Sequence, residues 1–105
     1  MRGSSFFVFR MNGSSMSNGR KWSFDDGDIL RCDEISAQDI QPGSKCVIKT
    51  NETYIVRQVT SIEDEVITAT PLNPLYEESR ISTSDILQVF VVRSCQMMEA
   101  DNVIK

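Results

Sequence analysis

The chain has 105 residues, of which 40% are hydrophobic and 25% are charged, which predicts one compact domain over residues 1–105 and excludes a chain that is disordered throughout. It contains no histidine, which excludes Ser–His–Asp and Cys–His nucleophile pairs and any zinc site that needs a histidine ligand. The formal net charge of -4 leaves no cationic surplus, so direct nucleic-acid binding by this chain alone is not expected.

Short runs rich in Val, Ile, Phe, Tyr and Thr, separated by Gly, Pro, Asn and Asp, predict an all-β fold, a barrel or sandwich of about six short strands. In chain order the predicted strands are residues 6–11, 28–32, 45–50, 53–60, 65–70 and 86–95. Only Asn51 and Glu52 separate the third strand from the fourth, which predicts a tight hairpin. Residues 36–40 and 83–87 are predicted to form single helical turns, and residues 97–105 are polar enough to fray.

The longest apolar stretch, residues 86–92, is interrupted by Gln88 and is far shorter than the roughly 20 residues that a membrane-spanning helix needs. The three cysteines, Cys32, Cys46 and Cys95, are an odd number without a C-x-x-C pair, which argues against a disulfide framework and a structural zinc site. We therefore expect a cytoplasmic protein without metal or cofactor, in which each cysteine is a small buried hydrophobic residue.

The segment from Gly13 to Gly19, Gly-Ser-Ser-Met-Ser-Asn-Gly, directly follows the first predicted strand. Small polar residues between strands usually form an ordinary loop. A functional interpretation is also open, because Gly13 permits a sharp turn that would present the next serine, and Met16 is apolar in an otherwise polar loop. A serine just beyond a strand can use neighbouring backbone N–H groups as an oxyanion hole.

Several motifs follow one another in a fixed order: Phe7-x-Phe9-x-Met11-x-Gly13-x-Ser15-Met16, Phe24-x-Asp26-Gly27-Asp28-Ile29-Leu30, Gly43, Tyr54-Ile55-Val56-Arg57-Gln58-Val59 and Asn73-Pro74-x-Tyr76. This series, roughly residues 6–92, resembles the C-terminal peptidase domain shared by LexA, UmuD and phage CI-type repressors, which are serine/lysine peptidases related to bacterial signal peptidases. The resemblance implies a mostly β fold that forms homodimers, often through the C-terminal strand, and that in repressors follows a helix-turn-helix DNA-binding domain. It also implies a serine that cleaves the protein's own linker, usually at an Ala-Gly or Cys-Gly bond, when a RecA filament promotes it, with a neutral lysine as general base.

Ser15 falls on the nucleophile position of this family, and Met16 lies beside it in the region of the oxyanion hole, but the lysine position falls on Arg57. An arginine stays protonated in proteins and cannot take a proton from a serine. Strand alternation places Arg57 on one face with Ile55 and Val59, from which it can point toward Ser15 as a fixed cation; the alternative is an edge residue with its charge in water.

Two further departures concern the substrate and the partner domain. Neither Ala-Gly nor Cys-Gly occurs in the chain, and few residues precede the first predicted strand. We therefore expect no DNA-binding domain within this chain, and expect any such domain or protein partner to lie outside it.

Three lysines near the site, Lys21, Lys45 and Lys49, could supply a relocated base, but exposed surface lysines are the more common interpretation. Asp26 and Asp28 are interpreted as structural acceptors of N–H groups in the turn that enters the second strand. The acidic residues 63–65 are interpreted as a solvated turn.

These observations lead to three hypotheses. The first is a LexA-like domain without its general base, which acts as a dimerisation or regulatory module related to phage-type transcriptional repressors and is not an enzyme. The second is a working serine/lysine peptidase that uses Ser15 and a relocated lysine. The third is a peptide-binding adaptor that holds an extended partner strand without cutting it.

Overall fold

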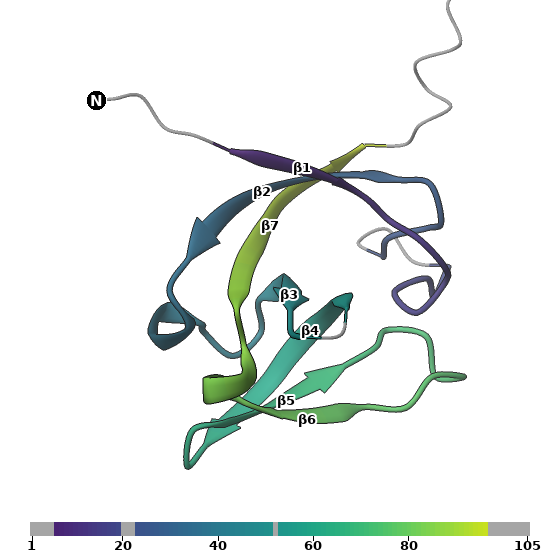
Figure 1. Ribbon diagram of the computed structural model, residues 1–105. Coiled ribbons are helices and arrows are strands. Elements are labelled where there is room, and N and C mark those ends of the chain that lie inside the picture. The colour runs from purple at the N-terminus through teal and green to yellow at the C-terminus, as the bar shows by residue number, and fades with distance from the viewer. Residues whose placement is uncertain (1–5, 20–22, 52, 97–105) are drawn as a thin grey trace, which may run out of the picture.

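The computed structural model describes residues 6–19, 23–51 and 53–96. Its strands form one antiparallel sheet in the order β1-β2-β7-β3-β4-β5-β6, and this sheet curls round on itself (Figure 1). The predicted all-β fold is confirmed. The strands are β1 (Phe7–Arg10), β2 (Ile29–Ile35), β3 (Lys45–Lys49), β4 (Tyr54–Glu63), β5 (Val66–Thr70), β6 (Ser79–Ser82) and β7 (Gln88–Gln96).

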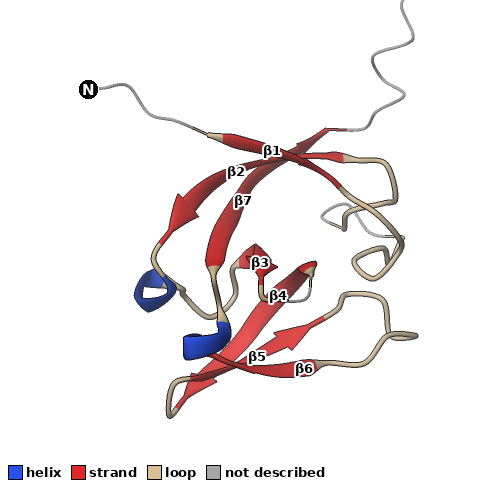
Figure 2. Ribbon diagram, viewed as in Figure 1, coloured by secondary structure: helices blue, strands red, loops and turns tan. Residues whose placement is uncertain are grey.

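Two short 3-10 turns, η1 (Ala37–Asp39) and η2 (Thr83–Asp85), lie within the two predicted helical turns (Figure 2). Each begins after a serine whose hydroxyl accepts a backbone N–H: Ser36 accepts from Gln38, and Ser82 accepts from Ser84. The residue that follows each turn has extended backbone angles, so neither turn continues as a helix.

The predicted hairpin between the third and fourth strands is confirmed. Lys49 of β3 lies opposite Tyr54 of β4, and the N–H of Thr50 donates to the carbonyl oxygen of Thr53 at 3.0 Å. Position 52 of the turn lies outside the described residues.

One strand of the structure, β6, was not predicted. Its sequence, Ser-Arg-Ile-Ser, contains a single apolar residue and therefore gives almost no strand pattern. The strand forms because β5 offers it a complete pairing partner at the edge of the sheet, where few of its side chains need to be buried. The structure also extends the second and fourth predicted strands, as far as Ile35 and Glu63.

The central strands are buried on both faces, so the molecule has two hydrophobic clusters. On β3, Val47 packs into one cluster while Cys46 and Ile48 pack into the other, as strand alternation requires. Neighbouring Val89 and Phe90 of β7 divide in the same way. We call the cluster that contains Phe90 the site cluster; it consists of Met11, Met16, Phe24, Leu30, Cys32, Val47 and Phe90.

The prediction for the cysteines is correct for two of the three. Cys32 and Cys46 are buried, whereas Cys95 is exposed, so the prediction that it is buried is wrong. Cys95 lies near the end of β7, where each residue from Arg93 to Gln96 is exposed. Its Sγ donates a hydrogen bond to Asp28 Oδ2 at 3.3 Å, which gives this thiol a polar partner.

None of the described residues forms a helix long and apolar enough to span a membrane. The predicted fraying of residues 97–105 falls outside the described residues, as does Lys21.

Candidate functional site

The loop that carries the serines begins with a sharp turn at the end of β1. Gly13 has a φ of +89°, in the left-handed region that glycine adopts without steric cost. Its N–H donates to Asp26 Oδ1 at 2.7 Å, and Asp28 Oδ2 accepts the N–H of Asp25 at 2.8 Å. Both aspartates are therefore structural acceptors of backbone N–H groups, as predicted. Asp26 joins the serine loop to the turn that enters β2, and Asp28 stabilises that turn.

The side chain of Met16 fixes the middle of this loop. It is fully buried in the site cluster, and its carbonyl oxygen accepts the N–H of Phe24 at 2.8 Å. Ser15, one residue earlier, is 6% exposed. The methionine therefore anchors the serine loop to the core and holds Ser15 at a fixed depth below the surface.

A second loop braces the first from the opposite side. The backbone N–H of Asn73 donates to the carbonyl oxygen of Ser15, and its Nδ2 donates to the carbonyl oxygen of Ser14, each at 2.9 Å. The hydroxyl groups of Ser14 and Tyr76 lie 3.2 Å apart. Both residues belong to the Asn73-Pro74-x-Tyr76 motif of the sequence, which did not indicate these contacts because their partners lie about 60 positions away along the chain.

Arg57 reaches the hydroxyl of Ser15. Its Nη1 donates to Ser15 Oγ at 2.9 Å and to the carbonyl oxygen of Val56 at 2.8 Å. Burial lowers the pKa of the Arg57 guanidinium, and nearby Tyr76 acts in the opposite direction. The group remains a cation near neutral pH and has no lone pair with which to accept a proton. In this arrangement Arg57 is a donor to the serine and not a base.

The lysines considered as relocated bases make other contacts. Lys45 Nζ lies 5.5 Å from the centroid of the Phe24 ring, and Lys49 Nζ lies 5.3 Å from that of Tyr54. Among the described residues, the side-chain hydrogen bond to Ser15 Oγ comes from Arg57.

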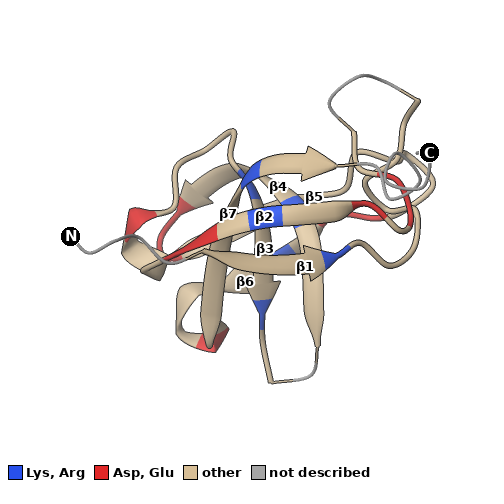
Figure 3. Cartoon of the chain, turned by 90° about the horizontal axis from the view of Figure 1, so that it is seen from above, with Lys and Arg blue, Asp and Glu red and all other residues tan. Residues whose placement is uncertain are grey.

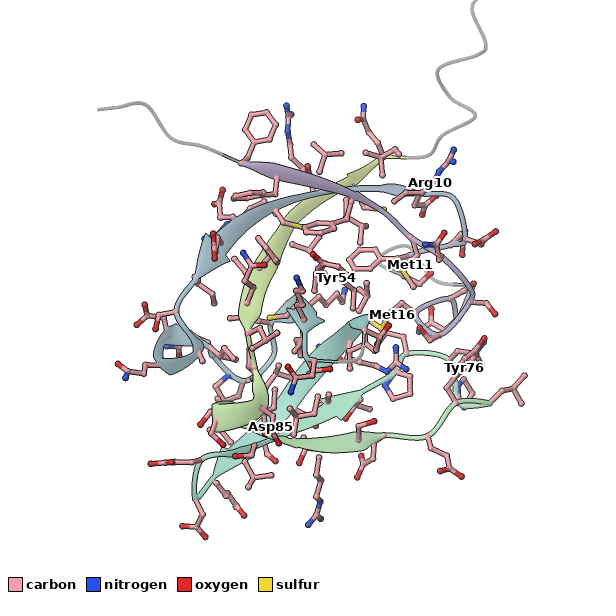
Figure 4. All side chains as sticks on the ribbon, in the orientation of Figure 1. Arg10, Met11, Met16, Tyr54, Tyr76 and Asp85 are labelled. Atoms are coloured by element: carbon pink, nitrogen blue, oxygen red, sulfur yellow. The ribbon has the colours of Figure 1, made fainter. Side chains whose placement is uncertain are left out.

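A cavity of about 260 Å³ opens beside this pair. Two runs of consecutive residues line it, from Phe9 to Ser15 and from Tyr54 to Arg57, together with Val47 and Tyr76. Figure 4 shows Met16 and Tyr54 inside the curve of the sheet, with Arg10 on its outer side. The rings of Phe9 and Tyr54 form one wall, with centroids 5.8 Å apart.

The strand edges at this cavity have no partner within the described chain. β1 pairs with β2 only, and the segment from Tyr54 to Arg57 pairs with β3 only, because β5 joins β4 from Gln58 onward. Unpaired strand edges present rows of N–H and C=O groups that an extended peptide can join. The cavity therefore combines a buried hydroxyl, a guanidinium and two free strand edges.

Comparison with known proteins gives one family. The model of the Peptidase S24-like family matches residues 1–92, which include both loops, β4 and the site cluster. No curated protein matches the chain significantly. The chain therefore belongs to the S24-like peptidase family, that of the C-terminal domains of LexA, UmuD and phage repressors, in agreement with the resemblance seen in its motifs.

Proposed function

We propose that this chain is an S24-like domain that does not cleave peptides and that acts as a dimerisation and regulatory module related to phage-type transcriptional repressors. The observation that carries the proposal is the hydrogen bond from Arg57 Nη1 to Ser15 Oγ. This bond supports the proposal, because a guanidinium in contact with Ser15 Oγ is a permanent donor, whereas an attacking serine needs a proton acceptor beside it.

The chemistry follows from the direction of that bond. A serine becomes a nucleophile when a neighbouring base removes its proton, a contribution worth about 10²–10⁴ in rate. A guanidinium cannot supply this step, and its N–H group occupies a lone pair of the oxygen that would have to attack. Ser15 is thus held as a hydrogen-bond acceptor.

Two other functions were considered for the same scaffold. An active peptidase would need Lys21, Lys45 or Lys49 beside Ser15. The amino groups of Lys45 and Lys49 lie near aromatic rings, and Lys21 lies outside the described residues. A peptide-binding adaptor is supported by the free strand edges at the cavity, and it is compatible with a regulatory module that does not cut what it binds.

Labelling with a fluorophosphonate tests the absence of an activated serine without requiring a known substrate. In this reaction the serine oxygen forms a bond to phosphorus, fluoride leaves, and the serine proton passes to a base. We expect no labelling of Ser15 in the wild-type chain between pH 7 and pH 9.5. In Arg57→Lys we expect the reagent to label Ser15 at least tenfold above the wild-type background. The rate should rise further at higher pH, because more of the lysine is then neutral. Mass spectrometry of the digested protein identifies the labelled residue.

Two variants serve as controls. Arg57→Met removes the guanidinium without adding a base and should stay at background, and the double variant Ser15→Ala/Arg57→Lys should lose all labelling at position 15. Labelling of Ser15 in the wild-type chain that disappears in Lys21→Ala, Lys45→Ala or Lys49→Ala would contradict the proposal and favour a relocated base. A folded Arg57→Lys variant that stays at background would show that Arg57 does not occupy the position of the base.

A further inference from the structure

Among the described residues, the cation inside the cavity has no counter-ion. The described residues that line the cavity include no aspartate or glutamate, although the whole chain carries an excess of acidic residues. Arg10 also belongs to the lining, but its side chain is exposed on the outer side of the sheet (Figure 4). Arg57 is therefore the cation that faces the interior, and among the described residues the recorded ion pair joins Arg93 and Asp33 instead.

The hydrogen bonds of Arg57 leave part of its guanidinium unused. Both bonds to the protein come from Nη1. Its Nε is buried and has no hydrogen-bond partner among the described residues. Buried polar groups are normally satisfied, and a buried charge is normally paired, because leaving either without a partner costs free energy. Because Arg57 lines the cavity, an anion that enters it would offset part of the free-energy cost of burying this charge.

Acidic residues are present close by but serve other contacts. Asp26 accepts the N–H of Gly13, and Asp25 accepts the hydroxyl of Ser17 at 2.7 Å. Figure 3 shows that acidic and basic residues share strands such as β2, which carries Arg31 beside Asp33 and Glu34. The missing counter-ion is thus a local feature of the cavity.

We infer that the cavity binds an extended peptide through a carboxylate that pairs with Arg57. A carboxylate forms strong, charge-assisted hydrogen bonds with a guanidinium, and the hydroxyls of Ser14 and Tyr76 lie at the same cavity. The free edges of β1 and of the first part of β4 supply backbone partners for the residues of the peptide that precede or follow the carboxylate. An inorganic anion would use the guanidinium but not these edges. This inference rests on the proposed function, because an activated serine would cut the bound peptide.

Nuclear magnetic resonance of the Arg57 Nε–H group tests the inference directly. Because this N–H is buried, its proton is sheltered from water and its resonance reports on anions that approach the guanidinium. The probes, at low salt, are N-acetylated tetra-alanine with a free carboxylate, the same peptide with a C-terminal amide, and acetyl-Ala-Glu-Ala-Ala-amide. We expect a carboxylate peptide to shift the resonance and to bind at least tenfold tighter than the uncharged amide. The free-terminus and glutamate peptides together show whether the carboxylate comes from a chain end or from a side chain.

Variants show whether Arg57 is responsible for the preference for carboxylate peptides over the amide. Arg57→Gln should remove the preference for the carboxylate, read from backbone amide shifts around the cavity, whereas Arg93→Gln, which removes an exposed charge on β7, should retain it. Equal binding of the amide and both carboxylate peptides to the wild-type chain would overturn the inference. So would inorganic phosphate that shifts the Arg57 resonance and displaces the peptide at the same concentration. Peptide binding and the labelling of Ser15 are separate measurements. Either of these two results would therefore contradict the inference and leave the proposed function untouched.

Discussion

Two neighbouring residues of the serine loop, Ser15 and Met16, have opposite surroundings. Ser15 faces a guanidinium at the cavity, and Met16 enters the hydrophobic core. The motif in the sequence contains both, and the resemblance assigned Met16 to the region beside the nucleophile. In the structure its side chain packs with Met11, Phe24 and Phe90 of the site cluster. The side chain of Met16 therefore stabilises the fold and holds Ser15 in place.

Replacing Met16 tests this contribution. Met16→Ala should lower the free energy of unfolding by about 2–5 kcal/mol, because it removes a fully buried side chain and leaves a cavity. Met16→Leu, which nearly conserves the volume, should cost less than about 1.5 kcal/mol. Urea denaturation followed by tryptophan fluorescence or circular dichroism gives both values. A loss below about 0.5 kcal/mol for Met16→Ala would show that the loop is not anchored by this side chain.

At the scale of the elements, β7 has two different halves. From Val89 to Val91 it is paired with β2 on one side and β3 on the other, so its edges are fully used. From Val92 to Gln96 it is paired only with β2 among the described residues. The proposed dimer through the C-terminal strand can therefore use the second half of β7, by pairing the free edge of one copy with that of another.

A charge on this free edge should weaken that dimer. In an antiparallel pair of identical strands, a residue near the two-fold axis lies close to its own copy, so Ser94→Asp would bring two carboxylates together. We expect sedimentation velocity to show a dimer whose dissociation constant rises at least tenfold in Ser94→Asp. Ser79→Asp, which adds the same charge to the edge strand β6, four strands away from β7 in the sheet, is the matched control and should leave the dimer unchanged. A monomer at all concentrations, or a dimer that only Ser79→Asp dissociates, would contradict this interface.

At the scale of the whole molecule, the thiols set the expected dependence of stability on alkaline pH. Burial raises the pKa of Cys32 to about 12 and that of Cys46 to about 11. Although the Cys95 residue is exposed, the partial burial of its thiol, together with the hydrogen bond to Asp28, raises its pKa to about 12. In the unfolded chain these thiols ionise near pH 8.5. Above that pH the unfolded state binds fewer protons than the native state, so the free energy of unfolding falls as pH rises toward the native pKa values.

We therefore expect stability to change little between pH 6 and pH 8, where the absence of histidine removes the usual titrating side chain, and to fall above about pH 9. Each of the two buried thiols should contribute a loss of roughly 1 kcal/mol per pH unit. Urea midpoints measured between pH 8 and pH 10 give the slope. Cys46→Ala should reduce it, whereas Val47→Ala, which destabilises the neighbouring position but keeps the thiols, should not. An unchanged slope in Cys46→Ala would contradict this account.

The strands that the sequence predicted well are those that are buried on both faces or alternate clearly. The continuous apolar run Cys46-Val47-Ile48 and the run that begins at Val89 are typical of central strands. The serine-capped turns were predictable because they are local, since each serine hydroxyl and the N–H group that donates to it lie two residues apart. The polar edge strand β6 was not predictable, because its pairing with β5 supplies what its own sequence lacks.

The sequence by itself determined that catalysis through histidine is impossible, that the fold is mainly β, and that Ser15 and Arg57 are the residues to compare. Only the tertiary structure decided that Arg57 donates to Ser15, that Asn73 braces the serine loop, and that Cys95 is exposed. The reason is distance along the chain. Composition and alternation are properties of neighbouring residues, whereas these contacts join positions 42 and 59 residues apart, and they exist only once the sheet has curled and both loops have packed against the site cluster.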